Sequence, residues 1–320
     1  MNNTPKKLPE HTIAFAPLYN VDVDEKLLGI DFNGYKIMTV KSLMETYTDN
    51  ISLFQKSDMH FFEAEIQSPL KYLIVLAGTN GIYNTTKEID SIEDPQILCN
   101  MLSNTLLYSR LFQSGDLQLG TTVVIKKDGT IYRNTEHTDF KCFFPGLQYS
   151  EYIHKPKPYK LTKNSVQDIL AYSQSLENKL ENDRFPEIFN ASWFFTRAYN
   201  TSDIAYKIIN FITVIEKLIA DDGEGGNITY KMQTRLTFLL KRNFDFIPTI
   251  YKIRNHILHT GNIVSDKYPI AKLYEYYYLL EDICRDLLKY FIHKFVNEDK
   301  DKIKDIFKEL DAKMFERLSE

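Results

Sequence analysis

The sequence predicts two parts, an α+β N-terminal domain with a mostly antiparallel sheet and an all-α helical bundle in the C-terminal half. Two observations lead to this division. Turn signals separate β-prone runs in the first 150 residues, whereas apolar residues recur at helical spacing after a lysine- and proline-rich segment. The chain has 320 residues, of which 43% are hydrophobic, and this suffices for two domains of ordinary size. We expect an N-terminal domain at residues 1–154, a linker at 155–160 and a helical domain at 161–320.

Two hairpin signals define the N-terminal domain. Asn33-Gly34 and Asp128-Gly129 each lie between runs of β-prone residues, and such pairs favour tight turns between antiparallel strands. A helix is predicted at residues 95–112, because Pro95 is favoured in a first helical turn. The predicted strands cover residues 27–32, 35–40, 59–66, 72–76, 121–125 and 130–133.

The second half of the chain has helical periodicity throughout. Two prolines among lysines at residues 154–160 disfavour regular structure and predict a stiff linker before it. A glycine-rich acidic stretch at residues 221–226 predicts a flexible loop between two of the helices. The predicted helices cover residues 161–180, 187–199, 204–218, 228–241, 246–259, 273–291 and 302–318.

Composition limits the class of function. The formal net charge is −4, so any contact with nucleic acid must be local. Cys99, Cys142 and Cys284 are far apart in sequence, which argues against a zinc ribbon and a disulfide framework and suits a reducing cytosol. The polar residues 1–10 lack the apolar core of a secretory signal, and no apolar run approaches a membrane span. We therefore expect a cytoplasmic protein with no membrane segment, no metal and no cofactor.

The strongest functional signal is the segment YKIRNHILHTG at residues 251–261. Arg254 supplies a planar, permanently charged group that suits a phosphate, and His259 can exchange a proton near neutral pH. Asn255 and His259 are four residues apart and so lie on one helix face, where the amide can orient the imidazole. His256 points away from His259 and is expected to be structural or peripheral.

These residue types suit RNA cleavage without a metal. The ribose 2′-OH is already beside the phosphorus, so the substrate carries its own nucleophile. The enzyme must accept the 2′ proton, protonate the leaving 5′ oxygen and stabilise the additional negative charge. A histidine and an arginine can meet these needs, although a helix C-terminus disfavours an anion while favouring a cationic histidine.

Arg254, the polar Asn255 after it and His259 four residues further on together resemble the R-x4-6-H motif of HEPN-superfamily ribonucleases. Residues 211–218 and 235–240 resemble earlier helices of the Apea-like HEPN group, so the resemblance covers residues 160–320. It implies a homodimer formed through the helical domain, in which two motifs form one metal-independent endoribonuclease site with Arg254, Asn255 and His259 as catalytic residues. It further implies an RNA-cleaving toxin or abortive-infection effector of antiviral defence. The N-terminal domain would then be a sensor or regulator that recognises a phage or host trigger.

Three alternatives remain open from the sequence. Arginine and histidine at this spacing also arise by chance, and basic residues near a helix C-terminus are ordinary capping partners. A HEPN domain can also be a non-catalytic module for dimerisation or for binding RNA or protein. The third alternative is a different enzyme site in the N-terminal half, although the acidic run at residues 88–94 is better explained as a solvated face. The tyrosines at 274 and 276–278 could stack on bases, but helical spacing places about half of them in the core.

Overall fold

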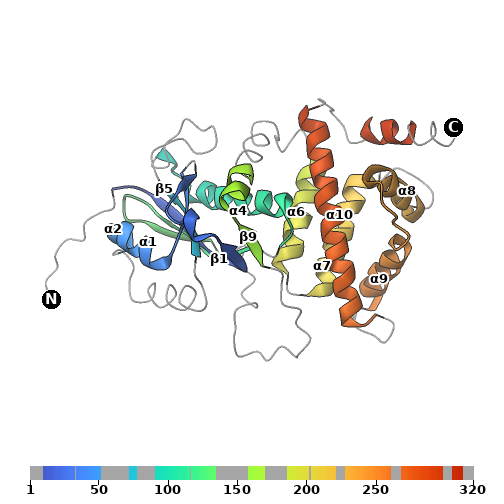
Figure 1. The fold of residues 1–320 in the computed structure, drawn as a ribbon, viewed down its shortest axis with the longest axis horizontal. Coiled ribbons are helices and arrows are strands. Elements are labelled where there is room, and N and C mark those ends of the chain that lie inside the picture. The colour runs from blue at the N-terminus through green and yellow to red at the C-terminus, as the bar shows by residue number, and fades with distance from the viewer. Residues whose placement is uncertain are drawn as a thin grey trace. The chain divides into compact units, whose positions relative to one another are not determined.

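The chain forms two compact units in a computed structural model of the protein (Figure 1). The first unit contains the described residues up to 134 together with 158–169, and the second contains those from 186 onwards. The first is α+β and the second is all-α, as predicted from the sequence. The structure describes residues 10–32, 34–51, 72–77, 91–115, 117–134, 158–169, 186–201, 203–220, 228–260, 268–297 and 305–312.

A seven-stranded sheet built around strand β1 (Ile13–Tyr19) is the centre of the first unit. β1 pairs antiparallel with β5 (Tyr72–Ala77) on one side and with β7 (Thr122–Ile125) on the other. The strand order is β3-β4-β5-β1-β7-β8, and β6 also pairs with β1; each of these pairings is antiparallel. The remaining strands are β3 (Asp31–Phe32), β4 (Tyr35–Met38), β6 (Gln118–Leu119) and β8 (Ile131–Asn134).

Both predicted hairpins are confirmed. Phe32 pairs with Tyr35 across the first turn, and Ile125 pairs with Ile131 across the second. Gly34 and Gly129 have φ values of 89° and 87°, which is the region that only glycine adopts without strain. The predicted strand 59–66 lies outside the described residues.

The strands of the first hairpin are shorter than predicted, because local caps begin helical segments at both ends. The Asp24 side chain accepts a hydrogen bond from the Lys26 amide at the start of the 3-10 helix η1 (Glu25–Leu27). Thr39 caps α1 (Val40–Thr46) in the same way, and a short helix α2 (Thr48–Ile51) follows. A capping side chain satisfies a helix N–H group that would otherwise lack a partner, so the chain turns into a helix at that point.

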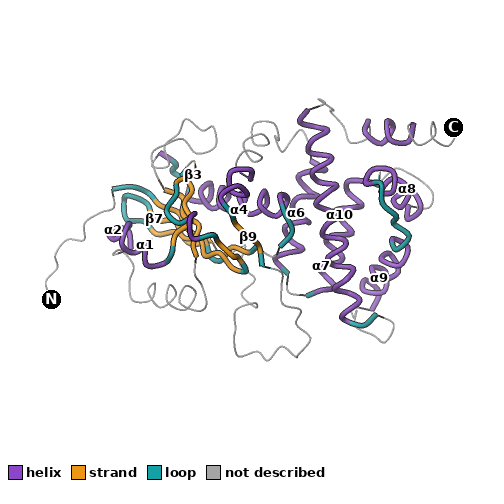
Figure 2. The backbone as a smooth tube through the Cα atoms, viewed as in Figure 1, coloured by secondary structure: helices purple, strands orange, loops and turns teal. Residues whose placement is uncertain are grey.

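Helices cover both faces of the sheet (Figure 2). Ile13 and Phe15 of β1 share one core cluster with Leu43 of α1. Leu18, on the opposite face of the same strand, lines a cavity together with Leu102 of α4 (Pro95–Phe112). The bounds of α4 agree with the prediction, and Asp94 caps it by accepting from the Gln96 amide.

The expected linker contributes a strand to the first unit. β9 (Tyr159–Leu161) pairs in parallel with β2 (Val21–Val23), whereas the sequence predicted no regular structure there. Tyr159 is fully buried, and its hydroxyl donates to the Ser109 carbonyl oxygen at 2.6 Å. Burial of this aromatic ring outweighs the local effect of the prolines before it. The helix expected at 161–180 is described at residues 163–169, within the same unit.

The second unit is a helical bundle in which α7 (Ile204–Ile219) is central. It packs against four other helices and buries apolar residues along most of its length. Each predicted helix from 187 to 260 is observed with ends within two residues of the prediction. The other helices are α6 (Pro186–Asn200), α8 (Ile228–Leu240), α9 (Ile247–Thr260), α10 (Ile270–Asn297) and a helical segment at 305–312.

Buried polar contacts join the helices of this bundle. The Tyr199 hydroxyl of α6 donates to Glu281 of α10 at 2.6 Å, and Arg285 forms an ion pair with the same carboxylate. Arg235 of α8 makes two contacts with Asp311 in the 305–312 segment, at 3.2 and 2.9 Å. None of the described helices is long and apolar enough to cross a membrane.

Candidate functional site

The motif residues lie on α9, and the core face of that helix determines how each one is exposed. Ile250, Ile253 and Ile257 form the buried face, as their spacing of three and four residues requires. Arg254 lies at the edge of this face and is partly buried. Asn255 and His259 lie on the solvent-exposed side of the helix.

Arg254 contacts a carboxylate of the neighbouring helix α7. Its Nη2 atom lies 3.5 Å from Oε2 of Glu216, and the two side chains are 29% and 24% exposed. The other oxygen of this carboxylate, Oε1, accepts a hydrogen bond from the Tyr251 hydroxyl at 2.8 Å. The guanidinium carbon also lies 5.9 Å from the centroid of the Tyr251 ring. Glu216 therefore links two residues that are one turn apart on α9.

Tyr251 is held in its neutral form. Burial raises the pKa of its hydroxyl well above the usual range, and the negative charge of Glu216 raises it further. The neutral hydroxyl donates a hydrogen bond to the Glu216 carboxylate. The negative charge of this carboxylate then pairs with the Arg254 guanidinium. In the Tyr251–Glu216–Arg254 cluster, the phenol donates a hydrogen bond to the carboxylate and the guanidinium forms an ion pair with it, so the cluster has no net charge.

Asn255 contacts the arginine of the motif. Arg254 Nη1 donates to Asn255 Oδ1 at 3.3 Å, so the amide lies beside the guanidinium. Within the described part of the chain, no hydrogen bond joins Asn255 to His259, although their spacing had suggested one. The structure brings Arg254 and Asn255 together and leaves the His259 side chain exposed to solvent, with no polar partner among the described residues.

His256 has a different environment from His259. Its ring centroid lies 6.1 Å from that of Tyr268, which is itself buried, and its carbonyl oxygen accepts from the Thr260 hydroxyl. His256 is partly buried while His259 is exposed. A histidine packed against an aromatic ring has less access to a substrate than one that faces solvent.

The arrangement places an anion-binding group and a proton carrier on one helix. A guanidinium has five N–H donors, and the hydrogen bond to Asn255 uses one of them. The remaining donors can hold a phosphate oxygen. Arg254 and His259 are five residues apart, which separates their directions by about 140° on a helix. One chain therefore presents the two groups on different sides of α9.

Glu216 is the site residue that sequence reasoning missed. It lies in the segment that resembles earlier HEPN helices, but the motif itself gave no reason to select it. The available signal was a carboxylate that lies four residues after Ile212 and one after Ile215, which are both buried. A charge beside a core face often has a partner on the adjacent helix.

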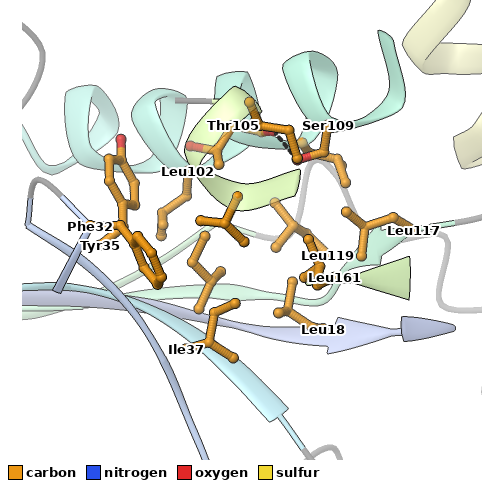
Figure 3. Close-up of a pocket in the computed structure, with 14 residues that line it drawn as sticks. Leu18, Phe32, Tyr35, Ile37, Leu102, Thr105, Ser109, Leu117, Leu119 and Leu161 are labelled. Atoms are coloured by element: carbon orange, nitrogen blue, oxygen red, sulfur yellow. Dashed lines mark hydrogen bonds between the residues drawn. The ribbon is translucent and has the colours of Figure 1, made fainter. Parts of the chain in front are cut away.

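The first unit offers a cavity of limited size. It measures about 50 Å³ between α4 and the sheet, and its lining is almost entirely apolar (Figure 3). Ligand sites in proteins are usually about 300 Å³ or larger. The hydroxyl of Ser109 at its edge already donates to the Thr105 carbonyl oxygen. This cavity is too small for a substrate, so it gives no support to an enzyme site in this unit.

No group of histidine, cysteine and carboxylate side chains suited to a metal ion occurs among the residues that the structure describes. No protein-family model, curated protein or solved structure matches the chain.

Proposed function

We propose that the protein is a metal-independent endoribonuclease whose site includes Arg254, Asn255 and His259. The observation that carries the proposal is the placement of Arg254 and His259 on α9. The Arg254 guanidinium is held from two directions by Glu216 and Asn255, while His259 is exposed on the same helix. A fixed cation and an accessible imidazole are the groups that transesterification of RNA requires.

The chemistry proceeds from the substrate's own nucleophile. The 2′ oxygen attacks phosphorus, its proton passes to a neutral imidazole, and the bond from phosphorus to the 5′ oxygen breaks. The departing 5′ oxygen takes a proton from an imidazolium. The products are a 2′,3′-cyclic phosphate and a 5′-OH. Arg254 binds the non-bridging oxygens, whose negative charge grows in the transition state.

A second copy of the chain would complete this site. One motif supplies one histidine of this kind, but the base and the acid are better provided by two. A two-fold axis through the helical unit doubles every group in a shared cleft. The proposal therefore includes a homodimer, to be tested by sedimentation at micromolar concentration. A strictly monomeric nuclease would contradict the shared site.

The biological setting forms part of the same proposal. RNA cleavage by such a site would make the protein a toxin or abortive-infection effector, with the N-terminal unit as the sensor of a phage or host trigger. It would act in the cytoplasm, where RNA is present and where the buried thiols of Cys99 and Cys284 remain reduced.

One observation favours a second candidate, a non-catalytic binding module. Glu216 neutralises Arg254 in the single chain, and His259 makes no contact with Arg254 among the described residues. A module of this kind would bind RNA or a protein without cleaving it. The two candidates differ in the products that they generate.

The test is incubation of the full-length protein with single-stranded RNA in the presence of EDTA. We expect fragments that end in a 2′,3′-cyclic phosphate and begin with a 5′-OH. A matched RNA with one 2′-deoxyribose at the scissile position should remain intact there, because the nucleophile is missing. Fragments with 5′-phosphates, or cleavage that chelation abolishes, would contradict the mechanism. Binding with no cleavage would favour the module.

A further inference from the structure

The exposed face of α6 carries two large aromatic side chains on adjacent turns. Phe189 and Trp193 are 50% and 49% exposed, although large aromatic residues are usually buried. They are four residues apart and therefore lie one above the other on the same side of the helix. They lie on the side of α6 opposite the face that packs on α7. Ile188, Ala191 and Phe195 are buried on that packed face.

Arg197 extends this face by one more turn. Its guanidinium carbon lies 4.9 Å from the centroid of the Trp193 ring, which is the distance of a cation–π contact. Within the described part of the chain, no ion pair or hydrogen bond engages this guanidinium. Arg254 differs in this respect, because it forms an ion pair with Glu216. Arg197 thus retains its charge for a partner.

The exposed residues of α6 include a positive charge and no negative charge. The exposed residues of α6 are Pro186, Phe189, Asn190, Trp193 and Arg197, and none of them is acidic. The acidic residue of the helix, Glu187, is half-buried. The chain as a whole has a net charge of −4, whereas the exposed residues of α6 include one cation and no carboxylate. Such a face complements a polyanion.

We propose that Phe189, Trp193 and Arg197 form a stacking surface for single-stranded RNA. Bases of an unpaired strand stack on aromatic rings and on guanidinium planes, and Arg197 can also contact the backbone phosphate. The two rings are about 6 Å apart along the helix axis, which lets adjacent nucleotides each meet one ring. This inference rests on the proposed function in one respect, since it names the surface that holds the RNA before cleavage.

The protein contains its own reporter for this contact. Trp193 is the single tryptophan of the chain, so its fluorescence reports on this face alone. The probe is a short single-stranded oligouridylate with 2′-O-methyl riboses, which the proposed chemistry cannot cleave. We expect titration to quench Trp193 fluorescence. Fluorescence anisotropy of the labelled probe gives the Kd by an independent signal.

Three substitutions test the proposed stacking surface, and one substitution on another helix serves as the control. Trp193→Ala and Phe189→Ala should each raise the Kd about 10-fold, because each removes one stacking partner. Arg197→Ala should raise the Kd and reduce its dependence on salt, because a phosphate contact is lost. Tyr230→Ala removes an aromatic residue of α8 that is also exposed, and it should leave the Kd unchanged. Thermal melting should show every variant folded, since these side chains are not core.

The outcomes separate this inference from the nuclease. Absent quenching, or an unchanged Kd for Trp193→Ala, would overturn the stacking surface while leaving RNA cleavage intact. A loss of self-association in Trp193→Ala at an unchanged Kd would also overturn it, because the face would then be a contact between copies. Quenching and a weakened Kd in a protein that cleaves no RNA would support the surface and reject the nuclease.

Discussion

Arg254 of α9 and Glu216 of α7 lie 3.5 Å apart, and this contact joins the motif to the centre of the helical bundle. Both side chains are partly exposed, and ion pairs of that kind contribute little to stability. They can still fix the direction of a long, flexible side chain. We therefore expect loss of this contact to affect the rate of catalysis more than the free energy of unfolding.

Glu216→Gln tests whether the carboxylate positions Arg254. The amide oxygen can still accept from Tyr251, but the ion pair is lost. We expect kcat for RNA cleavage to fall about 10-fold, because the guanidinium is no longer held against the developing charge. RNA binding at low salt should tighten, because a negative charge next to the phosphate site is removed. Single-turnover cleavage and anisotropy measure the two effects separately.

Asp286→Asn is the matched control for that variant. It removes the carboxylate of another partly exposed ion pair in the same unit, with Arg242 at 2.6 Å. We expect normal kcat and Kd. A purely structural role for Glu216 would lower the melting temperature with kcat and Kd unchanged, and this pattern would reject the positioning role.

Tyr251 gives a prediction about pH. Its folded pKa lies above its unfolded value of about 10, because burial and Glu216 disfavour the charged form. The stability from this shift is fully present below about pH 10 and is lost as the pH rises above that value. Urea unfolding between pH 9 and 11 should thus show a steeper fall for the wild type than for Tyr251→Phe. Parallel curves for the two proteins would show that Tyr251 is not held neutral.

Gly115 tests the placement of β9 in the first unit. A Cβ atom there would lie 2.9 Å from the Cα atom of Tyr159, and the φ of 147° also disfavours a side chain. Gly115→Ala should lower the free energy of unfolding by about 2 kcal/mol or more, measured by urea titration. Gly29→Ala is the control, since Gly29 has a φ of 76° but no atom within 4 Å of the added Cβ. It should cost about 1 kcal/mol. Equal losses would mean that Tyr159 does not pack against Gly115.

Local signals made the helices and hairpins predictable. α4 begins with Asp94 and Pro95, which cap and start a helix in any context, and the turn at Asp128-Gly129 requires a positive φ that glycine supplies. β1 had no such signal. Its residues are buried on both faces of the sheet, so the alternation of apolar and polar residues that marks a half-buried strand is absent.

The sequence predicted that Arg254, Asn255 and His259 lie on one helix, and they do, but it did not give their contacts. Arg254 borders the core face of the helix, and His259 faces away from it. Helical periodicity does not indicate which neighbouring helix meets Arg254, because that depends on how α7 and α9 pack. Glu216 and Arg254 are 38 residues apart in sequence, and only the tertiary structure brings them into contact. Asn255 likewise contacts the arginine, although its spacing had suggested His259.

Cleavage of single-stranded RNA by His259→Ala and His256→Ala, compared with the wild type in EDTA, tests the central claim most directly. The two histidines differ by three positions on one helix, so the pair controls for charge and local sequence. We expect His259→Ala to lose about 100-fold or more in rate, as Arg254→Ala should, because a proton carrier or a phosphate contact is removed. His256→Ala should retain most of the activity. Full activity in His259→Ala, or its loss in His256→Ala alone, would contradict the assignment of His259 as the proton carrier.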